Sequence, residues 1–194
     1  MAKANEDKVL FGFSDLYFGT FTENEDGSVT MGEPYHQRGA VGFSPEDQGS
    51  EYVFHADNVP YFSYYTSGTY QGDLVVARFD REFREKYLGQ VTLEDGGLAE
   101  IKNAIKPAVW MAFEVQGDKG PERLLYYNGS LGPINREFAT IEDSVEVQTE
   151  SMPILFSGDN KTGMTKVVYM EGDTGFETLF TNPPAPKLPE QQSE

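Results

Sequence analysis

The chain has 194 residues, a length typical of one domain with its own hydrophobic core. Its 32 acidic and 15 basic residues give a formal net charge of −17, which repels nucleic acid and anionic lipid and argues against a sequence-reading DNA-binding protein. The absence of cysteine excludes disulfides, thiolate metal sites and thiol nucleophiles, and it fits folding in a reducing cytosol.

The first residues, 1–8, are polar and are expected to form an N-terminal arm. No apolar run is long enough for a signal peptide or a membrane span, so we expect a non-exported protein without membrane insertion. From there to about residue 180 we find neither an internal repeat nor a linker. A single domain over residues 1–180 is therefore predicted.

Most of this domain consists of short runs rich in Val, Phe and Tyr, broken by Gly, Pro, Asn and Asp. This spacing is typical of strands joined by tight turns, and it predicts a mainly β fold. The Asp26-Gly27 pair is one such hairpin signal. We expect an antiparallel β-sandwich or half-barrel.

Tyrosine is concentrated in the segment from residue 61 to residue 70. Aromatic side chains fall on both faces of this segment, so we interpret it as an inner face combined with a subunit interface. A carbohydrate-binding platform is the alternative, because aromatic rings stack on flat apolar ligands. The residues predicted for the interface are Tyr61, Tyr64, Tyr65 and Tyr70.

One short helix is predicted at about residues 80–88. Asp80 is a good N-cap, and Gly89 can take the left-handed conformation that ends a helix. Phe83 and Tyr87 are four residues apart and share one face of the helix. We expect that face to pack on the sheet, because a helix this short is not stable alone.

The stretch "VEVQTES" alternates acidic or polar residues with apolar ones, as expected of a strand with one wet face. An ordinary solvated sheet face is the simpler interpretation. If the protein encloses a channel, the same acids would line it. The candidate lumen-facing acids are Glu146 and Glu150 on this strand and Glu114 on a neighbouring one.

From residue 158 onward we expect a final hairpin and an arm. Its last part, residues 181–194, is rich in Pro and polar residues and should be a mobile or extended C-terminal tail.

Catalytic and metal-binding patterns are weak. The two histidines, His36 and His55, lie near no triad or metal-ligand spacing, so no enzyme activity, metal or cofactor is expected. A hydrolase built on two acids and an acidic β-sandwich that binds carbohydrate or protein are the competing function classes.

Two blocks, "FHADNVPYFSYY" and "TYQGDLVVARFDREFREKYLGQ", resemble the major tail protein of long-tailed siphophages, the subunit of the tail tube. The following "KPAVWMAFEVQGD" and "RLLYYNGSL" look like the next strand pair of that family. The similarity runs from about residue 8 to about residue 157. The matching positions are Ala56, Asp57, Asn58, Tyr70, Gly72, Leu74, Phe83, Arg84, Leu88 and Gly89.

The resemblance implies a virion protein that is made in the host bacterial cytoplasm and assembles into stacked, hexameric rings. Their hollow tube would conduct phage DNA without binding it specifically. It also implies partners in the tail: the tape measure, the tail terminator and the baseplate or tip. We expect the segment between Met31 and Tyr52 to be a loop that reaches the next ring.

Overall fold

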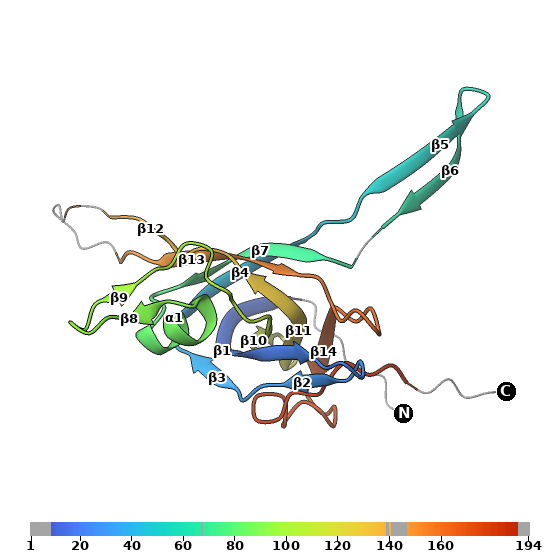
Figure 1. Cartoon of the computed structure of the whole chain (residues 1–194). Coiled ribbons are helices and arrows are strands. Elements are labelled where there is room, and N and C mark those ends of the chain that lie inside the picture. Colours follow the sequence, from blue (N-terminus) through green and yellow to red (C-terminus); the bar gives the residue numbers. More distant parts are fainter. Residues whose placement is uncertain (1–8, 67, 139, 141–146, 190–194) are drawn as a thin grey trace.

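The computed structural model describes residues 9–66, 68–138, 140 and 147–189 (Figure 1). It is mainly β, all strand pairs are antiparallel, and the path of the main sheet stays open, in the order β2-β1-β10-β11-β13-β7-β4. The predicted fold class, an antiparallel sandwich or half-barrel with a short flanking helix, is confirmed.

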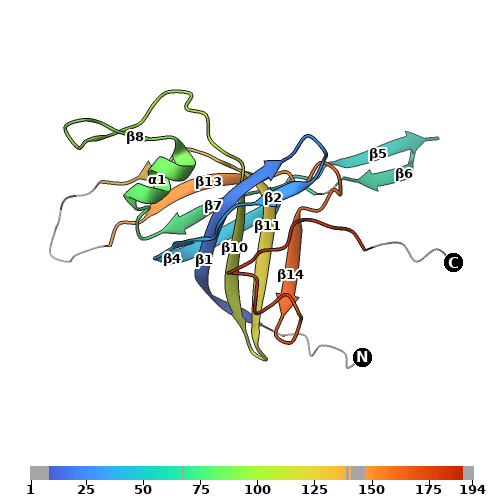
Figure 2. The ribbon, with the colours of Figure 1, turned by 60° about the horizontal axis from the view of Figure 1, so that its bottom comes forward.

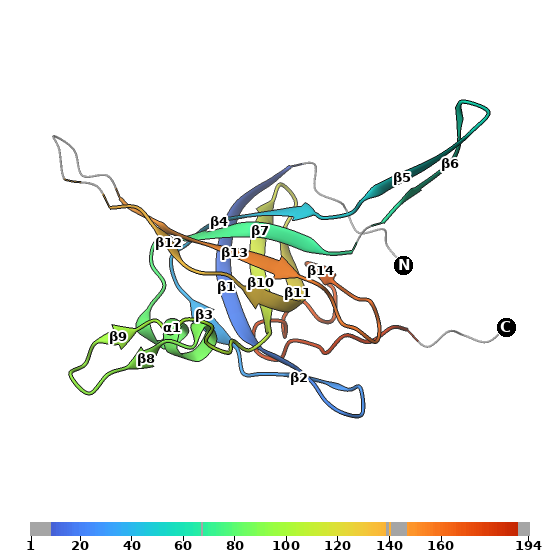
Figure 3. The same cartoon turned by 45° about the horizontal axis from the view of Figure 1, so that its top comes forward.

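The main sheet folds over itself into two layers. Figure 3 shows β4, β7 and β13 running across β1, β10 and β11. The lower layer holds β1 (Leu10–Glu23), β2 (Val29–Met31), β3 (Tyr35–Gln37), β10 (Val109–Gly117), β11 (Pro121–Leu131) and β14 (Lys166–Met170). The upper layer holds β4 (Ala40–Asp47), β7 (Tyr70–Val76), β12 (Asn135–Arg136) and β13 (Glu150–Phe156).

The core lies between these layers. Side chains from the inner face of each layer meet there, and all of the following are essentially inaccessible: Phe18, Leu74, Val76, Met111, Met152, Ile154 and Phe156. β10 is buried on both faces, because a second cluster around Trp110 and Leu125 fills the other side of the lower layer. The apolar run "VWMAF" reflects this double burial.

The chain after β14 covers this second cluster. Leu179 is fully buried in it, and Figure 2 shows the C-terminal segment crossing over β10 and β11. The Tyr127 hydroxyl donates a hydrogen bond to the carbonyl oxygen of Pro184 (3.0 Å). In place of the expected final hairpin, the single strand β14 pairs with β11, and the segment after it covers the second cluster. The contacts of this segment with the sheet continue past residue 180.

The helix α1 (Arg81–Leu88) begins and ends as its sequence predicts. The backbone N–H of Phe83 donates to the Asp80 side chain (2.9 Å), and Gly89 adopts the left-handed conformation at φ 65°. Phe83 and Tyr87 are fully buried, and both rings contact Phe18 of β1.

A two-stranded hairpin extends away from both layers. It consists of β5 (Glu51–Ala56) and β6 (Val59–Tyr65), and its turn residues Asp57 and Asn58 both have positive φ, as a type I′ turn requires. Figures 1 and 3 show it at one end of the molecule, with α1, β12 and the small β8–β9 sheet (Val91–Thr92 and Leu98–Ala99) at the opposite end.

The structure corrects the expectation of a loop before the hairpin. The segment between Met31 and Tyr52 is not a long loop, because β3 and β4 occupy most of it and β4 pairs with β7 along its length. The element that extends outward starts later, at residue 51. In the described ranges no helix is long and apolar enough to cross a membrane.

Candidate assembly surfaces

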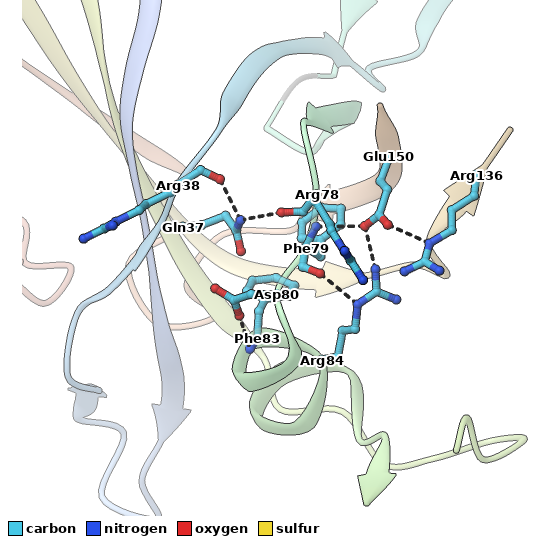
Figure 4. Close-up of polar contacts among 9 residues, drawn as sticks. All are labelled: Gln37, Arg38, Arg78, Phe79, Asp80, Phe83, Arg84, Arg136 and Glu150. Carbon is cyan, nitrogen blue, oxygen red and sulfur yellow. Dashed lines mark hydrogen bonds and ion pairs between the residues drawn. The ribbon is translucent and has the colours of Figure 1, made fainter. Parts of the chain in front are cut away.

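Glu150 is at the centre of a buried charge cluster (Figure 4). Its side chain accepts hydrogen bonds from Nη2 of Arg84 (2.6 Å) and from the backbone N–H of Phe79 (2.8 Å), and its other oxygen lies 2.6 Å from Nε of Arg136. Only 7% of the residue is exposed. The expectation of a solvated Glu150 on an acidic strand face is therefore wrong, because donors from α1, β12 and the chain before α1 enclose its carboxylate.

The backbone around this cluster is held by further polar contacts. Nε of Arg84 donates to the Phe79 carbonyl (2.9 Å), and Nε2 of the buried Gln37 donates to the carbonyls of Arg38 and Arg78. Burial lowers the pKa of Arg84; the charges of Arg136 and Arg78 lower it further, while Glu150 opposes the shift. Two guanidinium groups thus bind one carboxylate, and a third, that of Arg78, lies beside Arg84.

Glu114 is also withdrawn from solvent, at 8% exposed. Nε of Arg123 lies 2.9 Å from its carboxylate, and Nη1 of the same arginine donates to the Phe176 carbonyl (2.6 Å). The guanidinium lies over the rings of Phe176 and Phe180, at 4.0 and 4.5 Å from their centroids. Glu114 and Arg123 therefore fasten the C-terminal segment to the sheet, and neither offers a free charge to a channel.

The third predicted acid, Glu146, lies outside the described residues. Of its predicted strand, residues 147–149 are not in a strand, and Val147 is 82% exposed. β13 begins only at Glu150.

A solvated acidic face does exist, on the outer side of β4, β7 and β13. The strand register places Ser44 opposite Asp73 and Glu46 opposite Gln71, and all four side chains are exposed. Along the same side lie Val75, Ser151, Pro153 and Leu155. None of these eight residues, which we call the acidic face, is Lys or Arg. The sequence signal was the alternation of polar residues in "FSPE" and "YQGD".

The hairpin carries a second exposed surface. The register pairs Tyr52 with Tyr64 and Phe54 with Phe62, so the four rings share one side of the hairpin. We call them the aromatic face; each residue is between 49 and 59% exposed. Tyr61, at 76% exposed, and Tyr65 are likewise uncovered. The exposed hairpin thus carries three of the four tyrosines expected at an interface, with Tyr64 in the aromatic face and Tyr61 and Tyr65 outside it.

Tyr70, the fourth, is placed differently. It lies in β7 and packs against the core, with its ring 5.9 Å from that of Tyr126 and 4.5 Å from Nζ of Lys166. It does not share the hairpin surface. In the part of the chain that the structure describes, no three His, Asp or Glu side chains gather where they could hold a metal ion.

Two solved structures are similar to this chain at low sequence identity. The tube-terminating cap of the anti-feeding prophage matches at 7% identity with a TM-score of 0.49, over 88% of this chain and 99% of that chain. A chain of the sheath-tube complex of an extracellular contractile injection system, PVC, matches at 7% identity with a TM-score of 0.48, over 84% and 93%. No curated protein matches the sequence.

A family model is decisive. The model described as "Phage tail tube protein" matches residues 1–182, which is nearly the whole chain. The chain belongs to the phage tail tube protein family.

Proposed function

We propose that the protein is the major tube subunit of a long, non-contractile phage tail, in which stacked hexameric rings conduct DNA to the host. The chain belongs to a family of structural proteins that are not enzymes, and this membership establishes the general part of the proposal, that the protein is a tail tube component of the virion. The subunit is made in the host cytoplasm and meets the tape measure, the tail terminator and the tip complex during assembly.

The acidic face carries this proposal, as the wall of the channel. Double-stranded DNA has one negative charge per ~1.7 Å, and basic contacts repeated along a tube would retain it. A wall bearing Glu46 and Asp73 without Lys or Arg repels phosphates over ~8 Å at physiological salt. DNA then passes without sticking. Glu46 and Asp73 therefore replace Glu114 and Glu150 as the lumen acids.

Open sheet edges favour ring closure. Among the described residues, β4 pairs only with β7 and the short β12 only with β13, so the upper layer has a free edge at β4 and a short one at β12, next to where β13 pairs with β11. Pairing of one subunit's edge with the opposite edge of the next is a head-to-tail contact, which closes into a ring when the rotation permits. The upper layers would then form a continuous wall, with their acidic faces on the inside.

The test is a charge reversal on the channel wall. We expect Glu46→Lys with Asp73→Lys to leave tubes intact in negative-stain micrographs but to slow or block DNA release from phage that carry the variant. Glu25→Lys with Glu177→Lys changes the net charge equally at exposed sites off the acidic face, and it should release DNA normally. Normal release from the first variant would overturn the channel assignment.

A further inference from the structure

Arginine is concentrated at one place in this acidic chain. Four of the six arginines in the sequence line a single cavity of about 650 Å³ beside the start of α1. They come from the chain before the helix, from the helix itself and from β12, and they form what we call the arginine cavity: Arg78, Arg81, Arg84 and Arg136.

Three of the four arginines already pair with acids of the same subunit. Glu150 is shared by Arg84 and Arg136, and Glu85 pairs with Arg81 (3.1 Å). Asp80, which also lines the cavity, caps α1 and accepts a hydrogen bond from the Tyr35 hydroxyl.

Arg78 is exposed, and its guanidinium forms no ion pair within the described chain. Figure 4 shows its side chain beside Arg84. The exposed carboxylate of Glu100 also lines the cavity. Arg84 and Arg136 thus share Glu150, and Arg78 beside them is left able to pair with a further anion.

The hairpin has the complementary chemistry. From residue 48 to residue 69 its only formal charges at neutral pH are Glu51 and Asp57, and it contains no Lys or Arg. Asp57 is exposed in the turn at the tip, next to the aromatic face. Arginine both pairs with carboxylates and stacks on aromatic rings, as Arg123 does inside this subunit with Glu114, Phe176 and Phe180.

The two features lie at opposite ends of the molecule (Figures 1 and 3), and the hairpin continues from the ends of β4 and β7. Neighbours within a ring would meet through sheet edges, so contacts along the strand direction join one ring to the next. Resting on the proposed tube, we propose that the arginine cavity of one subunit receives Asp57 from the hairpin of a second copy in the adjacent ring.

A double-mutant cycle tests the contact, with the critical concentration for tube assembly as the measurement. Asp57→Asn keeps a residue that tolerates positive φ, and Arg78→Gln removes a charge that forms no ion pair with the described residues of its own subunit. We expect each change to raise the critical concentration about tenfold or more. The double variant should be no worse than the worse single variant, since both remove the same interaction.

Matched controls are Glu25→Gln and Arg38→Gln, which neutralise exposed charges away from the cavity and should assemble as the unmodified protein does. Circular dichroism verifies that every variant is folded. Single variants that assemble normally, or a double variant whose loss is the product of the two single losses, would overturn the contact while the tube itself stands. An unmodified protein that forms no tubes, even with the tail tip complex supplied, would instead refute the proposed function.

Discussion

Glu150 is the residue whose neutralisation should destabilise the subunit most directly, because it is the shared partner of Arg84 and Arg136. Glu150→Gln leaves two guanidiniums close together without their anion. We expect the free energy of unfolding to fall by about 3 kcal/mol, as when one member of a buried ion pair is removed. Urea unfolding followed by Trp110 fluorescence measures this. Glu46→Gln, on the exposed acidic face, should stay within about 0.5 kcal/mol.

Tyr126 makes the free energy of unfolding depend on pH in the alkaline range. Burial raises its pKa to about 12, whereas a tyrosine in the unfolded chain loses its proton near pH ~10. Since the folded state holds the proton longer, its contribution is complete below pH ~10 and is lost as the pH rises towards 12. We expect the free energy of unfolding to fall over this range, and Tyr126→Phe to make the fall shallower by on the order of 2 kcal/mol. An unchanged pH profile in that variant would contradict the assignment.

The expectation that Glu114 and Glu150 are exposed was wrong for an identifiable reason. Alternation predicts which residues share a side of a strand, but it does not predict what lies opposite them. The partners of Glu150 come from 66 and 14 residues earlier in the chain, and Glu114 is covered by a segment some 60 residues later. Such burial is decided by the fold as a whole. The exposed pair Glu46 and Asp73 had the same alternation and was not singled out.

Among the elements, α1 depends on its N-cap. Asp80→Ala removes the acceptor for the Phe83 N–H and for the Tyr35 hydroxyl, so we expect a loss of about 1 to 2 kcal/mol in thermal or urea unfolding. Glu82→Ala, on the exposed side of the first turn, should cost only a few tenths of a kcal/mol. Equal losses from the two changes would show that the cap contributes nothing specific.

Substitutions in the hairpin should impair tube assembly without affecting the folding of the subunit. Phe54→Ser with Tyr64→Ser removes two rings of the aromatic face, which are exposed in the free subunit. We therefore expect the free energy of unfolding of the monomer to change by less than about 0.5 kcal/mol while tube formation is lost. Tubes of normal yield in micrographs would show that the aromatic face is not an interface.

These two elements show what local sequence can predict. Every signal for α1 lies between Asp80 and Gly89, so the helix, its ends and its buried face followed directly. Both hairpin strands fall in runs rich in Val, Phe and Tyr, the composition from which the sequence predicts strands. Their projection from the sheet was not predicted, because aromatic residues on both sides of a strand are equally compatible with a buried core strand. Only the exposure of both strands, which no described element covers, identifies this hairpin as an arm.

For the whole molecule, net charge opposes assembly. Subunits at −17 repel one another over ~30 Å at 0.01 M salt but over only ~8 Å at 0.15 M. We expect added NaCl in this range to lower the critical concentration for tube formation, as light scattering would record. The Asp57→Asn variant should show an even stronger salt response, because it keeps the repulsion and lacks an attraction that salt weakens. A critical concentration that rises with salt would show that electrostatic attraction between subunits outweighs their repulsion.

Because the hairpin and the arginine cavity lie at opposite ends, the two ends of each subunit differ and the subunit has a direction. A growing filament would then have two chemically different tips, and a subunit without residues 51–65 could join at one of them but offer nothing to the next arrival. A small molar fraction of such subunits would act as chain stoppers, shortening the filaments from one tip while the other keeps growing.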